Sequence, residues 1–165
     1  MTSAEADALL AAPNQSTWTG RRDRTLLLLA LQTGLRVSEL VGLRLSDIEL
    51  GTGAHVHCSG KGRKERCTSL RKEAVTILRA WLRERNCNFS EPLFPNARGG
   101  QLSRDGVEYL LAKHVKTAQN HCLTLENKKI SPHVLRHSMA MDLLQHGVDR
   151  TVIALWLGHE KVETT

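Results

Sequence analysis

Residues 33–43 read TGLRVSELVGL and connect two segments of helical character. They follow RRDRTLLLLALQT, residues 21–33, which is so apolar that we expect it to form the central buried helix. Gly34 then ends that helix in the usual C′ manner, and VSELVGL begins a second, shorter helix. The connection between them therefore rests on a rigid, leucine-rich support.

Arg36 lies in this tight connection, two residues after Gly34. Its guanidinium offers a forked pair of donors that suits two oxygens of one phosphate. Glu39 follows three residues later and could orient the guanidinium. An ordinary surface arginine in a turn is the alternative interpretation.

The rest of the chain predicts a mainly α fold with a small antiparallel three-stranded β-sheet. Helical spacing of apolar residues, or capping signals, predict further helices at 2–12, 72–85, 103–118, 131–146 and 149–158. Three short extended segments, DIEL, AHVHC and ERCTSL, predict the sheet, and GKGRK joins the last two as an exposed basic hairpin.

Composition narrows the functional class. The chain has 165 residues, enough for one domain, with a net charge of +6 and a pI of about 9.5. The positive charge is clustered in KGRKERCTSLRK, residues 61–72, which indicates a polyanionic partner, nucleic acid before an acidic membrane. No apolar run approaches membrane-spanning length and no signal peptide is apparent, so the cytoplasm is the expected location. The four cysteines match no zinc spacing, and we expect free thiols and no metal.

The stretch SPHVLRHS, residues 131–138, supplies a second candidate site. His133 lies in the first turn of its helix, and Arg136 shares its face three residues on. Unpaired N–H groups and the helix dipole favour an anion at the same point, so phosphate would fit there. A helix start with two surface polar residues is the alternative.

Two further cationic sites lie in SGKGRKER and after the last helix. Lys61, flanked by glycines at the hairpin tip, could donate a proton to a leaving alkoxide or bind phosphate. Arg63, Lys64 and Arg66 are expected to make non-specific contacts to a DNA backbone. His159 follows Gly158 and suits a hydrogen bond to a charged group, or an interaction with the helix C-terminus.

The order of the motifs TGLRVSELVGL, GKGRKER, SPHVLRHS and LGHEKVETT resembles the catalytic domain of the tyrosine recombinases, the phage integrase family. The likeness is greatest to Xer and to transposon or integron-type integrases. By that resemblance, Arg36 corresponds to the first catalytic arginine and Lys61 to the hairpin lysine. His133 and Arg136 correspond to the HxxR pair. His159 corresponds to the last catalytic histidine, and Glu39 to the acidic residue that accompanies the first arginine.

The resemblance implies the DNA breaking-rejoining fold and site-specific recombination or integration of double-stranded DNA. In the family a tyrosine attacks the scissile phosphate, forming a 3′-phosphotyrosyl link and releasing a 5′-hydroxyl. A 5′-hydroxyl from another strand then reverses the step, with no cofactor, ATP or metal. The family works as a tetramer on paired sites.

Two differences from the family pattern set further expectations. We expect residues 1–165 to be the catalytic domain without the N-terminal core-binding domain and without the C-terminal segment that carries the tyrosine. Tyr109, the single tyrosine, lies mid-helix between apolar residues, so we expect it in the core or at its boundary. The chain would then bind DNA but not cleave it alone.

A non-catalytic helix-turn-helix module is the alternative function, because LLQHGVDRTVIALWLG resembles two helices around a glycine turn. Its second helix is too apolar to present polar side chains to base edges.

Overall fold

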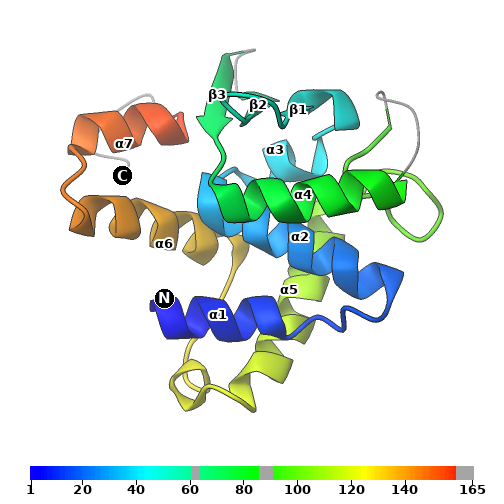
Figure 1. Cartoon of the computed structure of the whole chain (residues 1–165). Helices are drawn as coiled ribbons and strands as arrows, with labels where there is room; N and C mark the ends of the chain where they lie inside the picture. The colour runs from blue at the N-terminus through cyan, green and yellow to red at the C-terminus, as the bar shows by residue number, and fades with distance from the viewer. Residues whose placement is uncertain (61–63, 86–90, 159–165) are drawn as a thin grey trace.

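The computed structural model describes residues 1–60, 64–85 and 91–158. The α-helices are α1 (Ser3–Ala11), α2 (Trp18–Thr33), α3 (Val37–Val41), α4 (Lys72–Arg85), α5 (Arg104–Gln119), α6 (Pro132–Gln145) and α7 (Arg150–Leu157). Two short 3-10 helices in the described ranges are η1 (Leu45–Asp47) and η3 (Leu123–Leu125). The prediction of a mainly α fold with a small antiparallel sheet is confirmed (Figure 1).

The sheet has the order β1 (Ile48–Glu49), β2 (His55–Ser59), β3 (Glu65–Ser69), with antiparallel neighbours. Alternation along β2 and β3 gives the sheet one buried face, because Val56, Cys58 and Thr68 are all nearly inaccessible. Cys58 pairs in register with Arg66, and His57 pairs with the exposed Cys67. Arg66 therefore shares the inner face of the sheet, whereas Cys67 faces outward.

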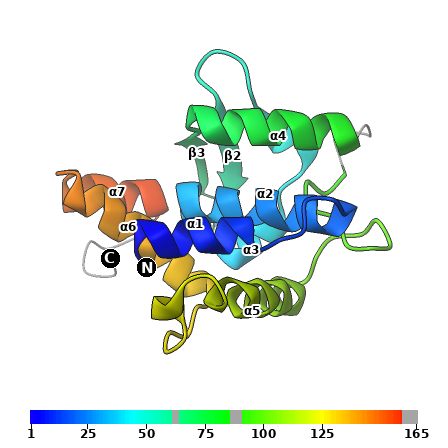
Figure 2. The same ribbon diagram turned by 60° about the horizontal axis from the view of Figure 1, so that its bottom comes forward.

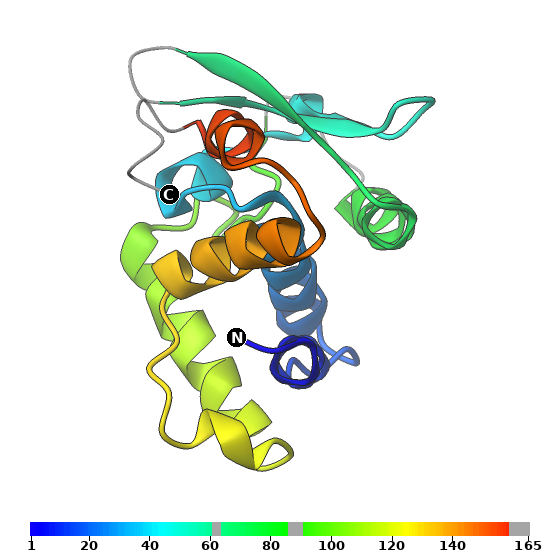
Figure 3. The ribbon, with the colours of Figure 1, turned by 90° about the vertical axis from the view of Figure 1, so that its left-hand side faces the viewer.

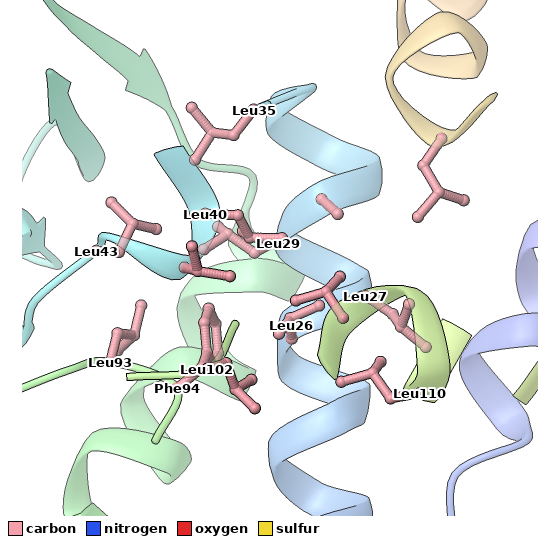
Figure 4. Packing of buried hydrophobic residues seen from close by; sticks show 14 of the residues in the cluster. Leu26, Leu27, Leu29, Leu35, Leu40, Leu43, Leu93, Phe94, Leu102 and Leu110 are labelled. Carbon is pink, nitrogen blue, oxygen red and sulfur yellow. The ribbon is translucent and has the colours of Figure 1, made fainter. Parts of the chain in front are cut away.

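Helix α2 is the central element of the fold, as its leucine run predicts. Its residues from Leu26 to Ala30 are all buried, and α4 and α5 lie on opposite sides of it (Figures 2 and 3). Leu26, Leu27 and Leu29 pack with leucines from α3, α5 and the connecting loops (Figure 4). The helix begins at Trp18, because the Thr17 hydroxyl accepts a hydrogen bond from the Gly20 N–H at 3.0 Å. The expected start at residue 21 was therefore three residues late.

A smaller apolar cluster joins α6 to α7 and consists of Met139, Ala140, Ile153 and Leu157. Figure 3 shows α7 between the sheet and α6. Gly34, at the end of α2, has φ 65° and approaches this cluster closely, since a Cβ there would lie 2.6 Å from Leu157 Cδ2. Glycine at this position lets the end of α2 meet both helices.

Buried polar groups tie distant parts of the chain together. Glu5 of α1 accepts hydrogen bonds from Lys128 Nζ at 2.7 Å and from Thr124 Oγ1 at 2.8 Å, which lowers its pKa to about 2. His114 Nε2 of α5 lies 2.7 Å from Asp23 Oδ2 of α2, so this buried pair ties the two helices together. Within the described ranges, no helix is long and apolar enough to cross a membrane.

Candidate functional site

A pocket of about 710 Å³ lies where the sheet, α3, α5, α6 and α7 converge. Its walls are strongly basic, and the cationic and imidazole side chains among its lining residues are Arg36, Lys64, Arg66, Arg104, His133 and Arg136. These residues are spread over a hundred positions of sequence, so the fold assembles the pocket from several elements. Such a concentration of positive charge suits an anionic ligand.

Arg36 occupies the connection that its sequence predicts, between the end of α2 and the start of α3. Its backbone is extended, with φ −66° and ψ 153°, and the preceding residue, Leu35, is buried in the core. The side chain is 39% exposed, and Nη1 lies 3.5 Å from Glu39 Oε1. The contact is long for an ion pair, so the guanidinium keeps donors for a ligand in the pocket.

Glu39 is a buried carboxylate that receives hydrogen bonds on both oxygens. Oε1 accepts from the Arg36 backbone N–H at 3.4 Å and from Arg36 Nη1 at 3.5 Å. Oε2 pairs with Arg66 Nη1 at 2.7 Å and accepts from Cys58 Sγ at 3.3 Å. Glu39 thus links α3 to the inner face of the sheet, and its shortest bond is to Arg66.

Cys58 contributes to this network as a protonated thiol. Burial raises the pKa of Cys58 to about 12; the charge of Arg66 opposes this rise, and the charge and hydrogen bond of Glu39 add to it. The thiol therefore keeps its proton at neutral pH and can donate it to Glu39. Sequence reasoning missed this residue, although alternation in AHVHC places it on the inner face with Val56.

Arg66 lies differently from the expected exposed DNA contact. It is on the inner face of β3, and its side chain is only 14% exposed. Nη1 pairs with Glu39, while Nε donates to the Trp156 carbonyl at 3.1 Å. The guanidinium is therefore held between α3 and the end of α7, whereas Lys64 on the same hairpin is exposed at the pocket.

Arg136 is buried and holds two helix ends together. Nη1 donates to the Gly34 carbonyl at 2.5 Å, and Nη2 donates to the Leu157 carbonyl at 2.6 Å. Burial, and then the positive charge of Arg36, lower its pKa to about 10, so it remains charged at neutral pH. Its two bonds leave other N–H donors of the guanidinium to face the pocket that it lines.

His133 lies in the first turn of α6, on the face that it shares with Arg136. The Ser131 hydroxyl accepts from the Val134 N–H at 3.3 Å, and Pro132 occupies the first turn, as the sequence predicts. His133 is exposed and lines the pocket. Arg104, at the start of α5, also lines it and was not anticipated.

Other sequence expectations have different outcomes. Lys61, Arg63 and His159 lie outside the described residues. Tyr109 is 74% exposed on α5 and is not among the lining residues, so its expected place in the core or at its boundary is wrong. Within 1–60, 64–85 and 91–158, no three His, Cys, Asp or Glu side chains are grouped to hold a metal ion.

The surroundings of α7 do not favour the alternative in which it is the recognition helix of a helix-turn-helix module. Ile153, Ala154 and Leu157 are buried, and the carbonyls of Trp156 and Leu157 accept bonds from Arg66 and Arg136. The end of α7 is therefore a wall of the pocket.

Comparison with known sequences supports a common ancestry over the whole chain. Residues 1–165 match the phage integrase family. The chain is 58% identical over 165 residues to a putative integrase/recombinase, y4rC, of Sinorhizobium fredii, covering 100% of this chain and 50% of that protein. It is 41% identical over 170 residues to the tyrosine recombinase XerD of Pseudomonas aeruginosa, covering 100% of this chain and 55% of XerD. The chain thus spans about half the length of these curated relatives.

Solved structures give the same result for the fold. The chain is similar to the XerA recombinase, with a TM-score of 0.84 and 29% identity over 99% of this chain and 57% of that one. It is also similar to the XerH site-specific recombinase bound to its difH substrate in a pre-cleavage complex. That comparison gives a TM-score of 0.82 and 28% identity over 99% of this chain and 48% of that one.

Proposed function

Because this chain belongs to the phage integrase family, as a tyrosine recombinase catalytic domain, we propose that its basic pocket binds the scissile phosphate of DNA during site-specific recombination. The observation that carries the proposal is the convergence of Arg36, His133 and Arg136, from two separate segments, on one pocket of about 710 Å³. The XerH relative, which is bound to its difH substrate, supports DNA as the ligand.

In this proposal the two arginines stabilise the charge that develops on the non-bridging phosphate oxygens. Arg36 presents a partly exposed guanidinium, and Arg136 is fixed by two carbonyls, so Arg136 does not have to reorganise during the reaction. His133 would assist proton transfer at the attacking tyrosine or donate to the phosphate. Removing one such preorganised donor costs roughly two to three powers of ten in rate.

The remaining family positions complete the proposed chemistry. Lys61 would protonate the departing 5′-oxygen, and His159 would donate to the phosphate. Attack by a tyrosine hydroxyl breaks the bond to the 5′-oxygen and forms the 3′-phosphotyrosyl link. Attack by a 5′-hydroxyl then restores a phosphodiester, so the bond energy is conserved and no cofactor is required. Arg63 and Lys64 would contact the DNA backbone, with double-stranded DNA as the partner and a tetramer on paired sites as the working assembly.

We expect these 165 residues alone to bind DNA without attaching to it covalently. Tyr109, the single tyrosine of the sequence, is exposed on α5 and is not part of the pocket lining. The cytoplasm is the proposed place of action.

A nicked suicide DNA substrate tests the proposal. The 165-residue chain and a version extended through a tyrosine segment are incubated with the substrate, and covalent adducts are separated by denaturing electrophoresis. We expect an adduct only with the extended protein, and its loss in Arg36→Ala and Arg136→Ala. A folded extended protein that forms no adduct would overturn the catalytic proposal. For the 165 residues, DNA affinity that does not fall with added salt would overturn the proposal that the basic pocket binds a DNA phosphate.

A further inference from the structure

Three walls of the pocket meet at one side chain, Arg66 of β3. Its Nη1 pairs with Glu39 of α3 at 2.7 Å, and its Nε donates to the Trp156 carbonyl of α7 at 3.1 Å. Gly158 packs directly on the guanidinium, since a Cβ at that position would lie 2.8 Å from Arg66 Nη1. Arg66 therefore fixes α3 and the end of α7 relative to the sheet.

The same contacts leave Arg66 poorly placed for DNA. Its remaining nitrogen, Nη2, is buried and has no hydrogen-bond partner among the residues that the structure describes, and the side chain is 14% exposed. Lys64, two residues earlier, is exposed at the pocket and offers the simple electrostatic contact instead. The role of Arg66 must then be exerted through the groups that it touches.

Glu39 is the group through which Arg66 reaches the phosphate site. Its short pair is with Arg66, and its contact with Arg36 is longer, at 3.5 Å. Without the Arg66 charge, the buried carboxylate would retain Arg36 as its nearby cation and would pair with it more closely. Arg36 would then give up donors that otherwise face the pocket.

We propose that Arg66 is a positioning residue, which holds Glu39 and the end of α7 so that Arg36 remains available to the phosphate. The inference rests on the proposed function, because it assigns the arrangement of the same phosphate pocket. It differs from a direct DNA contact in one respect that can be measured. The effect of removing Arg66 depends on the charge of Glu39.

The experiment titrates the ¹⁵N-labelled chain with inorganic phosphate, at ionic strength held constant with chloride. Binding is followed at the Arg36 side-chain Nε–H resonance, which is assigned by its loss in Arg36→Lys. The variants are Arg66→Gln, Glu39→Gln and the double variant Arg66→Gln/Glu39→Gln. Lys64→Gln removes a charge from the same hairpin and serves as the matched control.

We expect Arg66→Gln to shift the Arg36 resonance before phosphate is added and to weaken phosphate binding about tenfold. In the Glu39→Gln background, the Arg66 substitution should change phosphate affinity less than about twofold. Lys64→Gln should leave the free Arg36 resonance in place. If Arg66→Gln weakens binding equally in both backgrounds, Arg66 acts directly on phosphate and the inference is wrong.

Two further outcomes are decisive. If Arg66→Gln fails to fold, the comparison of Glu39→Gln with the double variant still decides, because neither leaves an unpaired buried carboxylate. A double variant that binds phosphate about tenfold more weakly than Glu39→Gln would again indicate a direct contact. If the unsubstituted chain binds neither phosphate nor DNA, the proposed function fails. The positioning role of Arg66 is then judged by the Arg36 Nε–H resonance without phosphate. If this resonance is unchanged in both Arg66→Gln and Gly158→Ala, the inference is refuted.

Discussion

Replacing Gly158 by alanine should destabilise the protein more than replacing Gly147, because the two methyl groups meet different surroundings. Both glycines follow a helix and have positive φ, 72° at Gly158 and 81° at Gly147. A Cβ at 158 would lie 2.8 Å from Arg66 Nη1 and 3.2 Å from its Cζ, whereas no atom of the described part of the chain lies within 4 Å of a Cβ at 147. The pair of variants therefore separates backbone strain from the contact with Arg66.

The magnitude follows from two contributions. A left-handed backbone costs an alanine roughly 1–2 kcal/mol, and this applies to both positions. At 158 the methyl group must also displace a guanidinium that is fixed by bonds of 2.7 Å to Glu39 and 3.1 Å to Trp156. Weakening one charge-assisted hydrogen bond costs about 1.5–3 kcal/mol. We expect Gly158→Ala to lose about 2 kcal/mol more than Gly147→Ala.

Urea unfolding followed by circular dichroism measures this difference. The free energies should be compared at equal m-values, and the thermal midpoint of Gly158→Ala should lie about 4–8 °C below that of Gly147→Ala. In an Arg66→Ala background the excess should disappear, because the obstructed group is gone. Equal losses for the two variants in the unsubstituted background would refute the contact between Gly158 and Arg66.

Three other predictions concern the cysteines, Glu5 and His114. Iodoacetamide should modify the exposed Cys67 in the native protein and spare Cys58, whose burial raises its pKa to about 12; peptide mass spectrometry resolves each site. Glu5 has a folded pKa lowered to about 2 from 4.5, so its contribution to stability is present above about pH 4.5 and is lost as the pH falls toward 2. Lys128→Met should remove about 1 kcal/mol at neutral pH and move the acid-unfolding midpoint upward, as measured by circular dichroism. His114→Phe should cost about 2 kcal/mol in urea unfolding, because it leaves a buried carboxylate without one partner.

Each of these predictions has a direct control. Unfolding in urea before alkylation should make Cys58 as reactive as Cys67, and native-state modification of Cys58 would contradict its burial. Lys129→Met removes an exposed neighbouring charge and should leave the acid midpoint unchanged. His121 is exposed just after α5, the helix that carries His114. The free energy of unfolding of His121→Phe should lie within about 0.5 kcal/mol of that of the unsubstituted protein. A similar loss for both histidines would contradict the special role of the Asp23 contact.

The sequence predicts the helices well where capping signals and apolar spacing agree. The bounds of α4 match the expected residues 72–85, and Ser131 with Pro132 marks the start of α6. The start of α2 differs because the cap formed by Thr17 lies in a polar stretch that has the composition of a loop. Capping there depends on a single hydroxyl, which composition does not distinguish from an ordinary loop residue.

The site is predictable in its residues and less so in its contacts. His133 and Arg136 line the same pocket, as their spacing of three residues suggested, and Arg36 lines it from the connection between α2 and α3. The partners of Arg136 are carbonyls at Gly34 and Leu157, and no local pattern indicates contacts over such separations. These bonds appear only when α2, α6 and α7 have packed together.

Arg66 and Tyr109 show where periodicity should outweigh composition. Counting Arg66 with its basic neighbours suggested an outward side chain, but alternation with the buried Thr68 places it inward. Tyr109 has apolar neighbours in sequence, yet it lies off the buried stripe of α5 formed by Val107, Leu110 and His114. In both cases the side chain's direction follows from the repeat of the element.

The walls of the pocket rest on two separate apolar clusters. Leu35 and Leu40, which flank Arg36 and Glu39, belong to the main cluster, whereas Met139 and Leu157 belong to the small one between α6 and α7. A local opening of the small cluster would separate the walls of the pocket while α2 stayed folded. Amide hydrogens of α7 should then exchange with solvent before those of α2, as expected for a separate cooperative unit. Such an opening would remove the site without unfolding α2.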